Sequence, residues 1–245
     1  MVKADECMQP AARPCKSGVR WRRPAALVLL FTSLILAWMA ARLLLAALFA
    51  GQTQTFLDDW FAQGGAPSPP AWEVARQAAT SAIALFPAAN GAYQERLGLV
   101  HSWRYRGRPF GDLLAAPSRQ AALAAYRAAV AATPLWPRAW TQIAYAKLDL
   151  GERDAGFRAS LHQAHALGPW RPDINRRIVE IGLIAWGSLD VTTRALTLES
   201  ARRVAAGSAE DAHWLLGLAK GRGMTLVVCV ALPDEIKRMH RICGS

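Results

Sequence analysis

Two short stretches, "TPLWPRAW" at 133–140 and "GPWRPDIN" at 168–175, decide the fold that we predict for this chain. In the first, Pro134 and Pro137 stand three residues apart, and the second stretch repeats that pair at the same spacing. Proline breaks the interior of a helix but suits the first helical turn. Each stretch therefore predicts the end of one helix and the start of the next, and the recurrence predicts a repeat.

One register ties three segments of the chain together. A shift of 35 residues places Ala129 on Ala164. The offset from Pro87 to Pro134 is 47, which is 35 plus the 12 residues of "GRPFGDLLAAPS" at 107–118. Further matches are Ile143 with Ile178, Tyr126 with Leu161, Ala122 with Phe157, and, across the insertion, Ala75 with Ala122, Ala82 with Ala129 and Tyr93 with Trp140.

The repeat predicts stacked helix pairs in an all-α fold, an α-solenoid. Small residues such as Ala129 let helices approach closely, a large residue such as Trp140 fills the gap between them, and stacked pairs bury a continuous core. The expected parts of the chain are a cytoplasmic basic tail (1–23), a transmembrane anchor (24–50), a stem helix with a Gly/Pro linker (51–70), the repeats (71–206) and a C-terminal capping segment (207–245).

The block "PAALVLLFTSLILAWMAARLLLAALFA" at 24–50 predicts a membrane-spanning helix. Only Arg42 in it is charged, and about 20 apolar residues span a bilayer as a helix. A buried soluble helix would need a partner on every side. A cleaved signal peptide is the closer alternative, but this apolar run is longer than the usual signal core, and "LFAGQ" is a poor cleavage site. We therefore favour an uncleaved anchor.

The flanking charges predict the orientation of this anchor. The basic residues Lys3, Arg13, Lys16, Arg20, Arg22 and Arg23 precede it, and the twenty residues after it hold no Lys or Arg. Basic residues stay on the cytoplasmic side, so residues 51–245 are expected in the periplasm, outside the inner membrane. The net charge of +11 is interspersed rather than clustered, and this placement argues against a nucleic-acid partner.

The four cysteines show no metal-binding spacing. Cys7 and Cys15 fall on the predicted cytoplasmic side, where thiols stay reduced. Cys229 and Cys243 fall on the outer side, where they could form a disulfide, which the sequence alone does not decide. The run "MTLVVCVAL" at 224–232 fits either a short strand or a buried helical turn.

Motifs for catalysis or cofactor binding are missing from the sequence. There is no phosphate-binding glycine loop, GxSxG, HExxH or CxxC. His162 and His165 stand three apart but lack further metal ligands nearby, and the adjacent Asp58 and Asp59 point apart on a helix. We expect no catalytic, cofactor-binding or metal site. An enzyme that modifies polysaccharide would need two positioned carboxylates, and the register offers no such pair.

Two family resemblances follow from these patterns. The residues Trp140, Ile143, Ala144, Gly151, Ala164 and Pro169 resemble the tetratricopeptide repeat, with one extra residue around "RDAG" and with Asn175 in place of the next aromatic. The anchor, the stem and "YRAAVAATPLWPRAWTQIAYAKLDLGERDAGF", followed by "LHQAHALGPWRPDI", are similar to VpsP-type polysaccharide biosynthesis proteins over about residues 25–205. That resemblance implies an accessory, non-catalytic role in exopolysaccharide production.

The function expected from the sequence is a membrane-anchored scaffold that binds protein partners of exopolysaccharide biosynthesis, assembly or export, with the polysaccharide itself as a further partner. A general envelope assembly factor is the alternative that repeat physics does not separate from it. Residues on the first helix of each pair line the groove of such a solenoid. The candidates for partner contact are Arg138, Thr141, Tyr145, Asp173, Arg176 and Glu180, the turn residues Trp136 and Trp170, and Gln94 and His101 from the looser repeat.

Overall fold

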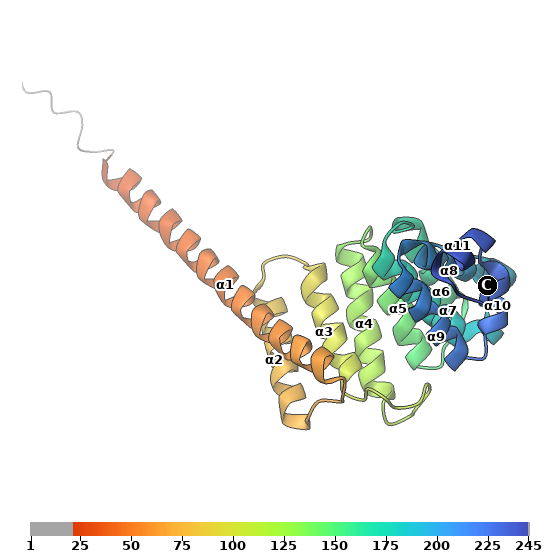
Figure 1. Ribbon diagram of the computed structural model, residues 1–245. Helices are drawn as coiled ribbons and strands as arrows, with labels where there is room; N and C mark the ends of the chain where they lie inside the picture. Colours follow the sequence, from red (N-terminus) through yellow and green to blue (C-terminus); the bar gives the residue numbers. More distant parts are fainter. Residues whose placement is uncertain (1–21, 245) are drawn as a thin grey trace, which may run out of the picture. The chain divides into compact units, whose positions relative to one another are not determined.

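The computed structural model describes residues 22–244, and these residues form helices joined by turns and by one longer loop between Trp103 and Ala116 (Figure 1). The helices are α1 (Arg22–Gln63), α2 (Pro69–Leu85), α3 (Gly91–Trp103), α4 (Ala116–Ala132), α5 (Pro137–Asp149), α6 (Ala155–Leu167), α7 (Pro172–Ala185), the 3₁₀ turn η1 (Trp186–Ser188), α8 (Val191–Gly207), α9 (Ala209–Gly221), α10 (Thr225–Ala231) and α11 (Asp234–His240). Within that range there is no strand, so the predicted all-α class is confirmed. The chain divides into two compact units between Leu44 and Leu45.

The first unit holds the N-terminal part of α1, which is long and apolar enough to cross a membrane. The most apolar window within Ala25–Gln63 has a mean hydropathy of 2.1 and is not buried by other parts of the protein. The hydroxyls of Thr32 and Ser33 donate to backbone carbonyls one turn earlier, at 3.0 and 2.8 Å. These bonds satisfy the polar groups within the helix itself, as an apolar surrounding requires.

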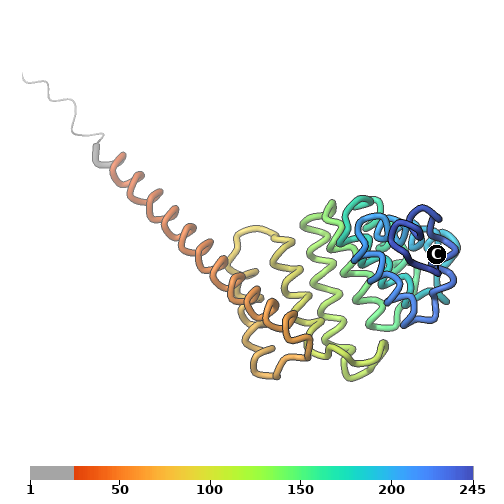
Figure 2. Tube along the Cα trace, in the orientation of Figure 1, coloured from red at the N-terminus to blue at the C-terminus, as the bar shows by residue number. Residues whose placement is uncertain are grey.

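In the second unit, each helix from α2 to α9 packs against the next, and α5 also contacts α7 while α6 contacts α8 (Figure 2). The C-terminal part of α1 belongs to this unit. Its Leu57 and Trp60 are buried with Trp72 of α2 and with Val100 and Trp103 of α3. The stem that the sequence predicted at 51–63 is therefore helical, and one of its faces is part of a core.

The recurring proline pair forms the same turn twice. The amide of Trp136 donates to the carbonyl of Thr133 at 3.1 Å, and the amide of Arg171, at the matching place, donates to Gly168 at 3.2 Å. Each preceding helix also ends with a matching backbone hydrogen bond: the amide of Thr133 donates to the carbonyl of Ala129 at 2.9 Å, and the amide of Gly168 donates to Ala164 at 3.0 Å. At the earlier turn, the amide of Phe86 donates to the carbonyl of Ala82 at 3.2 Å. The helix ends and starts that the two stretches predicted are confirmed.

Asn175 replaces the aromatic residue of the repeat without losing its hydrogen bond. The indole nitrogen of Trp140 donates to the carbonyl of Pro134 at 2.9 Å. The side-chain amide of Asn175 donates to the carbonyl of Pro169, also at 2.9 Å. Both side chains therefore satisfy an exposed carbonyl of the preceding turn, which is a polar role that the sequence analysis assigned to neither.

The segment after α9 is helical and carries a disulfide. The run "MTLVVCVAL" forms α10, so of its two sequence readings the helical one is correct. Val228, Leu232 and Ile242 complete a core with Val204 of α8 and Leu215 of α9. Cys229 and Cys243 are joined by a disulfide. This segment therefore covers the apolar end of the helix stack.

We expect Trp140→Ala to lower the free energy of unfolding by about 2 kcal/mol. A fully buried Trp loses about 3–5 kcal/mol on truncation to Ala, and the ring of Trp140 is only partly buried, although it packs against two core clusters. Trp170→Ala is the matched control, because Trp170 is 80% exposed and should cost less than about 0.5 kcal/mol. Denaturant unfolding of the two variants checks this, and equal losses would contradict the assigned register.

Candidate functional site

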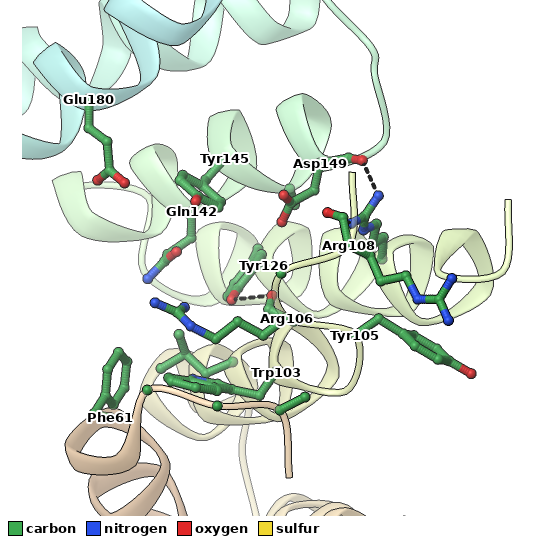
Figure 3. A pocket seen from close by; sticks show the side chains of 18 of the residues that line it. Phe61, Trp103, Tyr105, Arg106, Arg108, Tyr126, Gln142, Tyr145, Asp149 and Glu180 are labelled. Atoms are coloured by element: carbon green, nitrogen blue, oxygen red, sulfur yellow. Dashed lines mark hydrogen bonds between the residues drawn. The ribbon is translucent and has the colours of Figure 1, made fainter. Parts of the chain in front are cut away.

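A pocket of about 400 Å³ lies beside α5, and we call it the α5 pocket. Its lining combines aromatic rings with charged and amide side chains (Figure 3). The residues that line it are Phe61, Gly64, Gly65, Ala66, Leu99, Ser102, Trp103, Tyr105, Arg106, Gly107, Arg108, Arg119, Tyr126, Gln142, Tyr145, Ala146, Asp149, Arg177 and Glu180. The volume lies within the range of small-ligand pockets, whereas the lining is more polar than in most of them.

Equivalent positions of two repeats form one wall of the α5 pocket. Gln142 and Tyr145 on α5 fall 35 residues before Arg177 and Glu180 on α7. All four line the pocket, because α5 and α7 pack against each other and present the same face. The repeat itself therefore places two pairs of polar side chains together.

The insertion at 107–118, with the turn before it, forms another wall. It supplies Arg108 and follows directly on Tyr105 and Arg106. The amide of Gly111 donates to the carbonyl of Asp149 at 2.9 Å. Gly111 has a φ of +77°, a left-handed conformation that glycine adopts without strain. The insertion is thereby held against the C-terminal end of α5.

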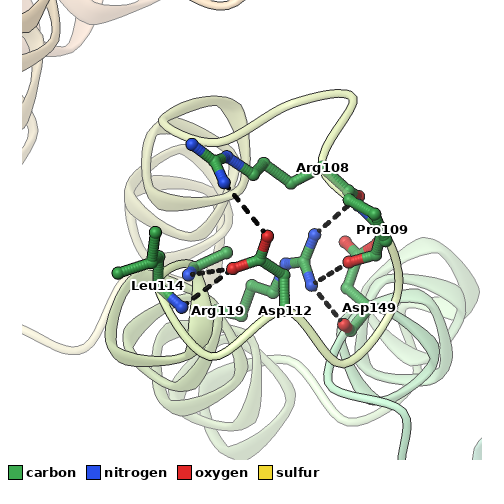
Figure 4. A network of polar contacts seen from close by, with 7 residues as sticks. Arg108, Pro109, Asp112, Leu114, Arg119 and Asp149 are labelled. Carbon is green, nitrogen blue, oxygen red and sulfur yellow. Dashed lines mark hydrogen bonds and ion pairs between the residues drawn. The ribbon is translucent and has the colours of Figure 1, made fainter.

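Arg119 fixes this arrangement from within (Figure 4). It is 5% exposed, and its guanidinium donates to the carbonyls of Arg108, Pro109 and Asp149 at 2.9, 2.8 and 2.6 Å. Asp112 accepts from Arg108 at 3.3 Å and from the amide of Leu114 at 2.8 Å. A buried cation that bonds three carbonyls acts as a clamp between α4, the insertion and α5.

Burial has the largest effect on the pKa values of two side chains in the pocket, Asp149 and Tyr145. It raises the pKa of Asp149 to about 6, although Arg119, Arg106 and Arg177 act in the opposite direction. Burial also raises the pKa of Tyr145. The carboxyl of Asp149 therefore loses its proton at a pH much closer to neutral than an exposed aspartate does.

We expect Asp149→Asn to stabilise the protein at pH 7.5 and to have little effect near pH 3.5. Between about pH 3.8 and 6 the unfolded chain has released this proton while the folded chain keeps it, so stability falls as the pH rises through that range. The full shift corresponds to about 3 kcal/mol, and contact with solvent in the pocket reduces this to about 1–2 kcal/mol. Comparing the unfolding free energies of the two proteins across this pH range checks the sign; a gap that does not depend on pH would contradict it.

Two of the residues predicted for partner contact, Tyr145 and Glu180, line the α5 pocket. The prediction for Thr141 is wrong. Its side chain is 2% exposed and its hydroxyl donates to the carbonyl of Arg138 at 2.7 Å, so it has no surface to offer a partner. The helical register places Thr141 next to the groove positions, but the neighbouring helices cover it.

The other predicted residues do not share one surface with the pocket. Arg138 pairs with Glu95 at 2.7 Å, and Asp173 pairs with Arg171 at 3.0 Å. Arg176 pairs with Asp211 at 3.2 Å, and its guanidinium lies 4.5 Å from the ring centre of Trp214. On α3, Gln94 and His101 are partly buried, with the His101 ring against Trp72. The single continuous groove expected from the register is therefore divided.

The two turn tryptophans lie on separate hollows. Trp136, 47% exposed, borders a hollow with Asn90 and Glu95. Trp170, 80% exposed, borders another with Arg176 and Arg203, and the Arg203 guanidinium lies 4.5 Å from its ring centre. Both rings remain available for contact with a partner.

His162 and His165 pair with helix α8 rather than with a metal. His162 shares a hydrogen bond of 3.1 Å with Thr193, and His165 one of 3.4 Å with Ser200. Within residues 22–244, no three His, Cys, Asp or Glu side chains gather as a metal site would require.

Sequence reasoning missed the second carboxylate of the pocket. It held that the register offers no pair, yet Asp149 and Glu180 line the same pocket. A readable signal was present, because Gln142, Tyr145 and Asp149 stand three and seven residues apart and so share one helix face. The residue that matches Asp149 one repeat later is the apolar Ile184, so the repeat itself gives no sign of a polar role at this position.

Comparison with known proteins adds no assignment: no protein-family model matches the chain, and a search of curated proteins finds no significant match.

Proposed function

We propose that this protein is a single-pass, membrane-anchored helical-repeat scaffold for exopolysaccharide biosynthesis, assembly or export, and that it acts by binding protein partners. The observation that carries the proposal is the turn repeated at Pro134 and Pro169 with the same backbone hydrogen bonds. It supports a solenoid of the tetratricopeptide type, whose stacked pairs expose extended surfaces for partners. The resemblance to VpsP-type proteins directs the proposal to exopolysaccharide.

The orientation is part of the proposal: the N-terminus lies in the cytoplasm and residues 51–245 lie in the periplasm. The basic residues that precede the apolar helix support it. The disulfide between Cys229 and Cys243 supports it independently, because disulfides persist in oxidising compartments.

We expect alkaline phosphatase fused after Ser245 to be active in cells, because that enzyme matures only outside the cytoplasm. A fluorescent reporter that matures only inside the cytoplasm should be dark at the same position. The same two reporters fused before Met1 should give the opposite pattern. A bright C-terminal fluorescent fusion with an inactive phosphatase fusion would contradict the orientation.

The scaffold itself is tested by photo-crosslinking in the host cell. A crosslinking amino acid at Tyr145 or Trp170 should capture a protein of the polymer pathway, and one at the exposed His162 on α6 serves as the control. Deletion of the gene should reduce secreted polymer. Normal secretion would exclude the exopolysaccharide role, and loss of other envelope structures together with normal secretion would favour a general assembly factor.

A second candidate function, a polysaccharide-modifying enzyme, is favoured by one observation. Asp149 and Glu180 line one pocket with aromatic rings, and the pKa of Asp149 is raised to about 6. Glycoside hydrolysis uses two carboxylates, one of them with a raised pKa. Glu180, however, accepts from Arg177 at 2.8 Å, which suits a positioned structural ion pair equally well. Release of reducing ends from the polymer by wild type, but not by Asp149→Asn or Glu180→Gln, would establish this function.

A further inference from the structure

Three polar side chains form a row along α5 and face the α5 pocket. Gln142, Tyr145 and Asp149 follow the helical spacing of one face, and Figure 3 shows them side by side above the cavity. Gln142 is only 7% exposed. Within residues 22–244, the α5 side chains that form hydrogen bonds or ion pairs are Arg138, Trp140, Thr141 and Lys147, so the three side chains of the row neither donate to nor accept from the protein.

The polar atoms of this row are open to the pocket rather than sealed in the core: Tyr145 and Asp149 are partly exposed, and the Gln142 amide is not among the buried polar atoms without a partner, so each group can bond a ligand there. An amide, a phenol and a carboxyl also differ in what they offer. Gln142 both donates and accepts, Tyr145 does the same, and ionised Asp149 only accepts. A ligand that satisfies all three must itself carry several groups that both donate and accept.

Aromatic rings lie across the pocket from this row. The rings of Phe61 and Trp103 meet edge to face with centres 5.0 Å apart, and the guanidinium of Arg106 lies 4.1 Å from the ring centre of Trp103 (Figure 3). Phe61 is half exposed and Trp103 is buried. The ligand therefore meets polar groups on one side and an apolar surface on the other.

Four arginines line the pocket against two carboxylates. Arg108 pairs with Asp112, and Arg177 pairs with Glu180. Within the described residues, Arg106 and Arg119 have no ion pair, and both act on the pKa of Asp149 in the direction that lowers it. The lining therefore carries an excess of positive charge, which disfavours a cationic ligand.

We propose that the α5 pocket binds a saccharide unit of one to three rings. Sugar hydroxyls both donate and accept, so they suit Gln142, Tyr145 and Asp149, and the apolar face of a sugar ring suits Phe61. The pocket size agrees with a ligand of this kind. The inference deepens the proposed function, on which it rests for the source of the saccharide: a segment of the polymer that the scaffold serves.

Saturation-transfer NMR on the full-length protein in lipid nanodiscs tests the proposal, since glycoside detergents would compete for the site. The probes are maltotriose, cellotriose and mannotriose, with glucuronate as the anionic comparison. We expect at least one neutral trisaccharide to bind at millimolar concentration. Gln142→Leu and Tyr145→Phe should each weaken that binding about tenfold, because each removes one hydrogen-bonding group and keeps the shape. His162→Gln on α6 is the control and should bind as wild type.

The proposal is overturned if neither glucuronate nor any of the three neutral trisaccharides binds, or if both pocket variants bind like wild type. Thermal melts of Tyr145→Phe separate lost binding from lost folding, since this change removes only a hydroxyl. Polymer secretion by the deletion strain separates the two proposals. If secretion falls but no saccharide binds, the scaffold function stands and saccharide binding in the α5 pocket is rejected. If a saccharide binds but secretion is normal, the scaffold function is rejected.

Discussion

Replacement of Arg119 by methionine is expected to lower the free energy of unfolding by about 3–5 kcal/mol, the largest effect of any single change considered. Methionine fills much of the same volume but removes three charge-assisted hydrogen bonds, to the carbonyls of Arg108, Pro109 and Asp149. The amides of Asp112 and Gly111 still donate to Pro109 and Asp149, so the carbonyl of Arg108 is the one left without a donor. Buried carbonyls without donors carry their full desolvation cost. The measurement is denaturant unfolding of wild type and variant under the same conditions.

Arg127→Met is the matched control for this prediction. Arg127 lies on the same helix as Arg119 and is exposed, so its replacement should cost less than about 0.5 kcal/mol. Hydrogen exchange locates the effect: in Arg119→Met the amide of Gly111 should exchange faster, because the insertion loses its attachment to α5. Similar losses in the two variants would show that Arg119 is not a clamp.

Removal of the disulfide by the double change Cys229→Ser and Cys243→Ser is expected to destabilise the C-terminal segment by about 3 kcal/mol. The bond closes a loop with a sequence separation of 14 residues, and a crosslink of that span restricts the unfolded chain by about this amount. Val228, Leu232 and Ile242 would then be held over α8 and α9 by packing and by the bond from Arg202 to the carbonyl of Ala231, at 2.8 Å.

Reduction provides the control for the disulfide prediction. Wild type in a thiol-free reductant should melt like the double variant, and the double variant should be insensitive to the reductant. Limited proteolysis should cleave after residue 222 in both reduced forms and leave oxidised wild type intact. Equal melting of oxidised and reduced wild type would contradict the stabilising role of the bond.

The repeated turn was predictable from sequence because its causes are local. Proline acts on its own backbone, so Pro134 and Pro137 mark a helix end and a helix start in any surrounding. The same holds for the Gly/Pro linker that separates α1 from α2. By contrast, "MTLVVCVAL" is too short for its periodicity to separate strand from helix, and packing against α8 and α9 decides for the helix.

The α5 pocket was not predictable in the same way, because long-range contacts build it. Arg119 bonds a carbonyl thirty residues away, and nothing in its local sequence distinguishes it from an exposed helical arginine. The burial that raises the pKa of Asp149 also depends on the fold as a whole. Tyr145 and Glu180 were found because the repeat register alone places them on the face that α5 and α7 share.

The segment 107–118 interrupts the register, and its first part forms a loop that is separate from the packed helices. The helices would keep their packing if residues 107–114 differed in side chains, provided that Arg119 still bonded the carbonyls at 108 and 109. Ala115 and Ser118, by contrast, are buried and belong to the packed part. Loops on a rigid framework tolerate such change far better than helix interfaces do. Changes confined to residues 107–114 would therefore reshape one wall of the α5 pocket, while α5 continues to present the same row of polar groups.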